Sequence, residues 1–254
     1  MNKTIPNADV FICAHEQGQT GEALPTWASA RPGLISFGTP AEDAVRHDID
    51  GVPGGFHLQD VLSSAECDAL TRITETMGYT LDAPVSLSHD VRHNTNVNWV
   101  VDDSITDPIW QRCAPHITET LPTTEGTLHS AGLNARFRFY RYGVGDYFKP
   151  HSDGAWPGSK VIDGHLVADA FGDRISWFTM LLFLSDEYDG GGTRFYIPAT
   201  SESPANEVSV STPKGWALVF PHGYHPLHCI HAGETITRGV KDIIRTDILF
   251  AEVP

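Results

Sequence analysis

FRFYRY, at residues 137–142, is the first of six short runs of β-branched and aromatic residues in the C-terminal half of the chain. The other five are WFTMLLFL (177–184), TRFYI (193–197), EVSVS (207–211), WALVF (216–220) and KDIIRTDILF (241–250). Glycine, proline, asparagine and aspartate separate the runs. This pattern is typical of an all-β sandwich or barrel.

The N-terminal half has a different pattern. Apolar residues at spacings of three and four predict an amphipathic helix over 64–77, and Ser63 with Glu66 has the spacing of a capping box. A strand is expected at 97–101 and a second helix across 105–120, where Pro115 argues against one straight helix.

These segments predict a single domain over residues 1–254. Residues 1–50 are rich in Pro, Gly, Thr and Ala with little periodicity, so an irregular arm is expected there. Residues 51–133 are expected to form a helical support region and residues 134–254 a β core. The predicted class is mainly β with α support (α+β).

Composition excludes several classes of protein. The net charge of −15 argues against binding to nucleic acid or to an anionic membrane. Four dispersed cysteines without a CxxC pair argue against a thiolate zinc site and a disulfide framework. No apolar run approaches the roughly 18–20 residues of a membrane helix, and the N-terminus lacks the apolar core of a signal peptide. A cytoplasmic location is therefore predicted.

The sequence His151-Ser152-Asp153 follows a predicted strand. Residues i and i+2 of an extended segment point to the same side, so His151 and Asp153 can converge on one metal ion. His231 is a candidate third ligand. Two histidines and one carboxylate with open positions form the facial triad of non-haem Fe(II) oxygenases.

Three segments carry a resemblance to a known family: YRYGVGDYFKPHSDG, FTMLLFLSDEYDGGGTRF and PKGWALVFPHGYHPLHCIHAGETITRGVKDIIRTDILF. Together they resemble the 2-oxoglutarate- and Fe(II)-dependent dioxygenase superfamily, and within it the prolyl 4-hydroxylase-like branch. The resemblance covers about residues 134–250. It implies a double-stranded β-helix core, of the jelly-roll or cupin-like type, flanked by N-terminal helices.

The resemblance also implies roles for individual residues. The positions that match the iron ligands are His151, Asp153 and His231. The positions that match the groups binding the distal carboxylate of 2-oxoglutarate are Tyr142, Thr179 and Lys241, the last of which follows His231 by ten residues. Two alternatives stay open: His228 in place of His231, and Arg245, on the same strand face as Lys241, sharing or replacing its role.

Substrate contacts are less clearly marked. The candidates are Arg92, Asn94, Arg138, Tyr140 and Trp156. A structural hydrogen-bond role is the alternative for Arg92 and Asn94, solvation for Arg138, an ordinary inward-facing position for Tyr140, and packing for Trp156. The segments 80–100 and 154–173 are candidate specificity elements. The latter is either a mobile lid, because it combines glycines with apolar residues, or a loop docked permanently on the barrel.

The function implied by the resemblance is hydroxylation of an unactivated C–H bond, coupled to oxidative decarboxylation of 2-oxoglutarate to succinate and CO2. Fe(II), 2-oxoglutarate and O2 are the implied cofactors, with ascorbate as a candidate reductant. The substrate is a prolyl residue of a peptide, a free amino acid or another small molecule. The alternatives are a non-catalytic cupin-like metal-binding or sensory module, a nucleic-acid demethylase and a metal-dependent hydrolase. The acidic charge disfavours the demethylase, and the 2-oxoglutarate-binding residues disfavour the module and the hydrolase.

Overall fold

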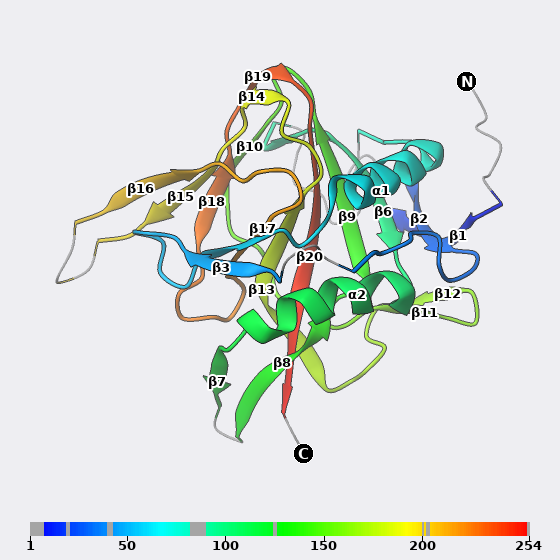
Figure 1. Ribbon diagram of the computed structural model, residues 1–254, viewed down its shortest axis with the longest axis horizontal. Coiled ribbons are helices and arrows are strands. Elements are labelled where there is room, and N and C mark those ends of the chain that lie inside the picture. The colour runs from blue at the N-terminus through cyan, green and yellow to red at the C-terminus, as the bar shows by residue number, and fades with distance from the viewer. Residues whose placement is uncertain are drawn as a thin grey trace.

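The computed structural model describes residues 8–18, 21–39, 43–81, 90–123, 126–199, 201 and 204–252. Within these ranges the protein is mostly β, with one eleven-stranded sheet, one five-stranded sheet, two two-stranded sheets and two α-helices (Figure 1). No helix in the described ranges is long and apolar enough to cross a membrane.

The large sheet has the strand order β1-β2-β6-β9-β20-β13-β17-β4-β3, and β8, which carries β7, pairs with β20. Its strands are β1 (Val10–Gln17), β2 (Ala23–Ser29), β3 (Val45–Asp48), β4 (Phe56–Gln59), β6 (Thr95–Val100), β7 (Thr120–Pro122), β8 (Thr127–Leu133), β9 (Arg136–Tyr142), β13 (Arg174–Phe183), β17 (Ala217–Pro221) and β20 (Lys241–Glu252).

The five-stranded sheet has the order β16-β15-β18-β10-β5. Its strands are β5 (Arg92–His93), β10 (Tyr147–His151), β15 (Thr193–Ile197), β16 (Asn206–Val210) and β18 (Ile230–Gly233). The two small sheets are the pairs β11 (Lys160–Ile162) with β12 (His165–Val167), and β14 (Tyr188–Gly190) with β19 (Ile236–Gly239).

The helix predicted over 64–77 is confirmed as α1 (Ser64–Met77), and both hydrogen bonds of its capping box are present. The second helix, α2 (Asp103–Cys113), is shorter than predicted and begins at the Asp102 cap. A 3₁₀ turn, η1 (Ala114–His116), follows it. Pro115 lies in this turn, where its missing N–H costs less than it would inside an α-helix.

The predicted irregular arm over residues 1–50 is wrong for the described part of that segment, which contributes β1, β2 and β3. β1 pairs antiparallel with β2, and β2 pairs parallel with β6. The burial of β1 does not alternate strictly, so local periodicity gives a weak signal. The strand is instead held by pairing at the sheet edge and by an ion pair, 2.5 Å long, between Glu16 and the buried Arg136.

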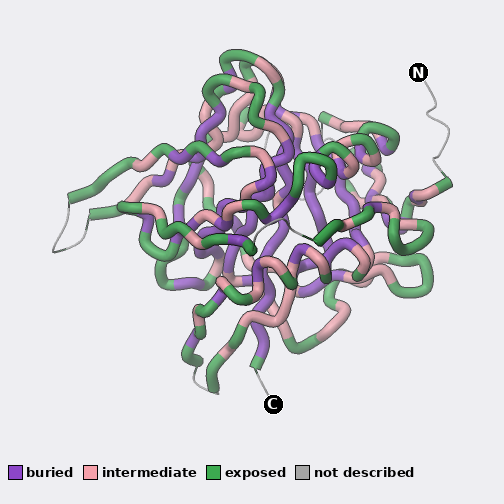
Figure 2. The backbone as a smooth tube through the Cα atoms, in the orientation of Figure 1, coloured by how far each residue is buried: buried purple, intermediate pink, exposed green. Residues whose placement is uncertain are grey.

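The two faces of the large sheet have different partners, because successive residues of a strand point to opposite sides. Phe137, Phe139 and Ile244 point to one face and pack in one cluster with Leu70 of α1 and Ile105 of α2. Figure 2 shows these central strands as buried and the connecting loops as mostly exposed. The helices therefore cover this face.

The opposite face packs against the five-stranded sheet. Tyr140, Tyr142 and Ile243 form one cluster with Phe195 of β15 and Phe220 of β17. The two sheets thus enclose a second core, as in a β-sandwich. Since β9 and β20 present alternate residues to this side, any polar residue in register with Tyr140 and Tyr142 also faces the five-stranded sheet.

The segment 154–173 contains a hairpin, β11–β12, that is docked on the large sheet. Asp163 and Gly164 both have positive φ (50° and 78°), as a two-residue type I′ turn requires. Val161 and Leu166 pack against a buried cluster that includes Val100. None of residues 154–173, all of which the structure describes, lines the cavity discussed below. This structure therefore matches the docked alternative, and movement of the segment on substrate binding stays a prediction.

The four cysteines are buried and free. Burial raises the pKa of Cys67 and of Cys113 to about 12. These thiols therefore stay protonated and act as small apolar side chains in the core.

Candidate metal centre and cofactor pocket

His151, Asp153 and His231 come together at one point. One ligand atom from each residue lies within 4.8 Å of the other two. His151 ends β10, Asp153 follows it, and His231 lies on the neighbouring strand β18, directly opposite His151. The alternative ligand, His228, is exposed, and its Nδ1 lies 3.3 Å from the carbonyl oxygen of His225. The structure thus favours His231 over His228.

A β-bulge sets the direction of His151. Phe148 pairs with Gly233 and His151 pairs with His231. Between these two pairs β10 therefore advances by three residues and β18 by two. Residues three apart on a regular strand would face opposite sides, but the extra residue returns both Phe148 and His151 to the cavity. Their rings stack with centroids 3.5 Å apart, which holds the imidazole in place.

Both histidines present the same nitrogen to the site. The Nδ1 atoms of His151 and His231 lie 2.8 and 3.2 Å from the backbone oxygens of Lys149 and Cys229. A carbonyl oxygen only accepts, so each Nδ1 carries the ring proton and each Nε2 keeps a free lone pair. The Nε2 atoms lie 3.8 and 3.7 Å from the Asp153 carboxylate. This is the tautomer a metal-ligating histidine needs.

The charge states also suit a divalent cation. Burial and the neighbouring His231 lower the pKa of His151 to about 4, and burial lowers the pKa of His231 as well. Burial alone would raise the pKa of Asp153, but Arg245 and the two histidines hold it well below its usual range. Two neutral imidazoles and one carboxylate result, and this donor set fits Fe(II) with open positions.

A cavity of about 490 Å³, counted with its open mouth, adjoins the three ligands between the two sheets. Its lining comes from both sheets and consists of Tyr140, Tyr142, Phe148, His151, Asp153, Leu181, Thr193, His231, Ala232, Gly233, Glu234, Lys241, Ile243 and Arg245.

Lys241 supplies a buried cation to this cavity. Its side chain lies among the rings of Tyr142, Phe183 and Tyr188 and contacts the carbonyl oxygen of Gly191 at 2.5 Å. Within the described chain no carboxylate lies within ion-pair distance of it. Burial lowers the pKa of Lys241 to about 8, partly offset by Glu234. An anionic ligand would restore the missing counter-charge.

The turn before β15 leaves room for this lysine only because it is made of glycines. Gly191 has a φ of 66°, and a Cβ there would lie 2.3 Å from Ile236 Cδ1 and 3.3 Å from Lys241 Cδ. An alanine at this position would therefore be strained and would also crowd the lysine.

Arg245 and Thr179 have partners that differ from the predicted ones. Arg245 Nε lies 3.3 Å from Asp153 Oδ2, and its Nη2 lies 3.2 Å from Asp247 Oδ1, so its charge is already paired. Thr179 does not line the cavity, and its hydroxyl donates to Asp153 Oδ2 at 2.7 Å. The predicted contact between Thr179 and 2-oxoglutarate is therefore wrong. The alternation of side chains along the strand predicts that Thr179 faces the metal site. It does not predict that the Thr179 hydroxyl contacts Asp153.

The five predicted substrate residues lie at different depths. Tyr140 lines the cavity. The Arg92 guanidinium lies over the Tyr140 ring, 5.4 Å from the ring centre. Asn94 is buried beside Tyr142, and its amide makes no hydrogen bond of normal geometry within the described residues. Arg138 instead pairs with Asp247 and stacks on Trp156, away from the cavity lining.

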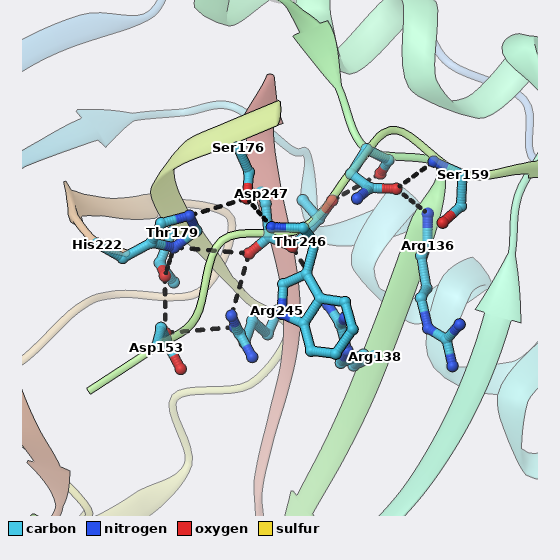
Figure 3. Close-up of polar contacts among 12 residues, drawn as sticks. Arg136, Arg138, Asp153, Ser159, Ser176, Thr179, His222, Arg245, Thr246 and Asp247 are labelled. Atoms are coloured by element: carbon cyan, nitrogen blue, oxygen red, sulfur yellow. Dashed lines mark hydrogen bonds and ion pairs between the residues drawn. The ribbon is translucent and has the colours of Figure 1, made fainter. Parts of the chain in front are cut away.

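Sequence reasoning missed His222, Ser176 and Asp247, which form a buried polar cluster with Thr179 and Arg245 behind Asp153 (Figure 3). For Asp247 a signal existed, since it is two residues after Arg245 and so shares its strand face. For the contact between His222 and Ser176 there was none, because the two residues lie 46 positions apart in sequence.

Comparison with models of known protein families finds no match, and neither does comparison with curated proteins. Several solved structures are similar in fold. A viral collagen prolyl hydroxylase from Paramecium Bursaria Chlorella virus-1 is 18% identical, with a TM-score of 0.48 over 78% of this chain and 97% of that one. A Pseudomonas putida prolyl-4-hydroxylase is 15% identical, with a TM-score of 0.48 over 79% and 94%.

A third similar structure is a prolyl hydroxylase from Trichoplax adhaerens, solved with a hypoxia inducible factor oxygen degradation domain peptide fragment. It is 14% identical, with a TM-score of 0.48 over 77% of this chain and 83% of that one. These likenesses concern only the course of the backbone, and the functional argument rests on the side chains described above. In fold, the chain is similar to prolyl hydroxylases of the 2-oxoglutarate- and Fe(II)-dependent oxygenase type.

Proposed function

We propose that this protein is an Fe(II)- and 2-oxoglutarate-dependent dioxygenase that hydroxylates an unactivated C–H bond. The observation that carries the proposal is the juxtaposition of His151, Asp153 and His231 with a cavity that contains the Lys241 cation, which has no carboxylate partner among the described residues. A metal site alone would suit many functions. A buried cation beside it suits a co-substrate that chelates the metal at one end and carries a carboxylate at the other.

Each part of the chain has one task in this proposal. His151, Asp153 and His231 hold Fe(II), and Lys241 with the Tyr142 hydroxyl holds the distal carboxylate of 2-oxoglutarate. The apolar lining residues, such as Leu181 and Ile243, exclude water. When bound, Fe(II) supplies the chemistry by which O2, 2-oxoglutarate and a C–H bond become succinate, CO2 and a C–OH group.

Succinate release tests the proposal. Purified protein is given Fe(II), 2-oxoglutarate and, in turn, proline-containing peptides, free amino acids and other small molecules, first without O2 and then with it. We expect O2-dependent succinate release that matches a one-oxygen gain in one substrate. Metal binding without succinate release for any candidate would favour the non-catalytic cupin-like alternative.

The finer assignments belong to the same proposal. The two facing sheets support a double-stranded β-helix core, and Tyr140, Arg92 and Asn94 are the proposed substrate contacts. A prolyl residue, a free amino acid and a small molecule remain the candidate substrates. Ascorbate as reductant and a cytoplasmic location stay predictions.

The pKa of Lys241 predicts how 2-oxoglutarate binding depends on pH. With a pKa of about 8, the lysine is mostly charged at pH 7 and mostly neutral at pH 9. Since the bound carboxylate requires the charged form, affinity for 2-oxoglutarate should fall above pH 8, approaching tenfold per pH unit. The measurement is the 2-oxoglutarate concentration for half-maximal succinate release between about pH 6.5 and about pH 9.5.

The matched variant for the pH profile is Lys241→Arg, because a guanidinium stays charged throughout this range. Its 2-oxoglutarate requirement should be flat with pH, even if its affinity is lower at every pH. A wild-type profile equally flat through pH 8 would contradict the assignment of Lys241.

A further inference from the structure

We propose that Thr179 is a positioning residue for the metal-ligand carboxylate of Asp153, and that His222 and Ser176 fix the direction in which Thr179 donates. The inference rests on the proposed metal site. Figure 3 shows contacts that run from Ser176 through His222 and Thr179 to Asp153, which also contacts Arg245. Ser176, Thr179 and His222 are at most 1% exposed, so water cannot replace any contact between them.

The direction of the first two hydrogen bonds follows from the chemistry of the groups. Thr179 Oγ1 lies 2.7 Å from Asp153 Oδ2 and 2.7 Å from His222 Nδ1. An ionised carboxylate only accepts, so the single hydroxyl proton of Thr179 is directed at Asp153. His222 Nδ1 must then carry the ring proton and donate it to Thr179 Oγ1.

The rest of the row follows in the same direction. With its proton on Nδ1, a neutral His222 accepts at Nε2, which lies 2.9 Å from Ser176 Oγ. Ser176 therefore donates to His222, and its oxygen accepts the backbone N–H of Trp156 at 2.8 Å. Burial lowers the pKa of His222, which favours the neutral ring. All four hydrogen bonds thus run toward Asp153.

The row distinguishes the two oxygens of Asp153. Oδ2 accepts the Thr179 hydroxyl and lies 3.3 Å from Arg245 Nε. Each oxygen lies near one ligand histidine, Oδ1 3.8 Å from His151 Nε2 and Oδ2 3.7 Å from His231 Nε2, but Oδ1 accepts no hydrogen bond within the described chain. Because Oδ2 is held, the carboxylate cannot rotate freely, and Oδ1 remains for the metal. Outer partners of this kind orient metal ligands and tune affinity.

Metal binding by the 254-residue chain tests the inference. The probe is Co(II) alone, followed by calorimetry and by its visible absorption spectrum. Thr179→Val keeps the side-chain shape but removes the donor, and it should weaken Co(II) binding by about 10–100-fold and alter the spectrum. Thr179→Ser keeps the hydroxyl and should restore both. If Thr179→Val does not fold, the pair Thr179→Ala and Thr179→Ser, which differ only by the hydroxyl, carries the same test.

The matched control is Thr246→Val. Thr246 is equally buried, and its hydroxyl donates to the carbonyl oxygen of Asn134 at 2.7 Å, away from Asp153. It should lose comparable thermal stability but keep wild-type Co(II) affinity. Thr179→Val with the affinity and spectrum of Thr246→Val would overturn the inference. Wild-type protein that binds Co(II) no better than Asp153→Ala would instead overturn the proposed metal site.

Discussion

Alanine in place of His151, Asp153 or His231 should abolish metal binding and turnover. Among the described residues three protein ligands converge here, and two remaining ligands hold a labile divalent ion poorly. Loss of an outer partner of a metal ligand typically costs 10–100-fold in affinity, so loss of a ligand itself should cost more than about a hundredfold. Calorimetric titration with Fe(II) under anaerobic conditions measures the affinity, and succinate release measures turnover.

The control for the ligand variants is His228→Ala. His228 lies three residues before His231 but is exposed, so its loss should leave affinity and turnover near the wild-type values. The assignment of His231 would be wrong if His228→Ala abolished Fe(II) binding and His231→Ala retained it.

Lys241→Ala should raise the 2-oxoglutarate requirement by at least about a hundredfold. The lysine is 3% exposed and without a carboxylate partner in the described chain, so its loss would remove the buried cation that we propose as the counter-charge of the bound carboxylate. Breaking one side of a buried charge pair costs about 3–5 kcal/mol, and about 1.4 kcal/mol corresponds to tenfold in affinity. The measurement is the dependence of succinate release on 2-oxoglutarate concentration.

Two further variants make the Lys241 result specific. Lys160→Ala removes a surface lysine that pairs with Asp103 and should leave the requirement unchanged. Arg245→Ala should act mainly on metal affinity, because Arg245 contacts Asp153. An unchanged requirement in Lys241→Ala, together with a large rise in Arg245→Ala, would assign the carboxylate to Arg245 instead.

The sequence predicts those parts of the fold that depend on neighbours along the chain. The capping box of α1 and the apolar runs of β9, β13, β15 and β20 are local signals, and each corresponds to an element of the structure. The facing of His151 and Asp153 toward one point also follows from spacing, although a bulge within β10 contributes to it.

Features that depend on distant partners were missed. β1 is stabilised by pairing with β2 and by Arg136, which lies 120 residues from Glu16. The row behind Asp153 joins three separate segments, around Asp153, Thr179 and His222, so no local pattern reveals it. The hairpin β11–β12 is different: Asp163-Gly164 between two apolar pairs is a strong hairpin signal that was overlooked within the long segment 154–173.

Because of the bulge in β10, the number of residues between Phe148 and His151 determines whether the His151 imidazole faces the cavity. The two residues between them, Lys149 and Pro150, are exposed, so substitutions there should be tolerated. Deleting or inserting one residue would reverse the parity and turn the His151 imidazole toward the opposite side of the sheet. A protein with every ligand present and one residue too few would then lack a metal site. In related sequences, a gap in this short segment would therefore be as informative as the loss of a ligand.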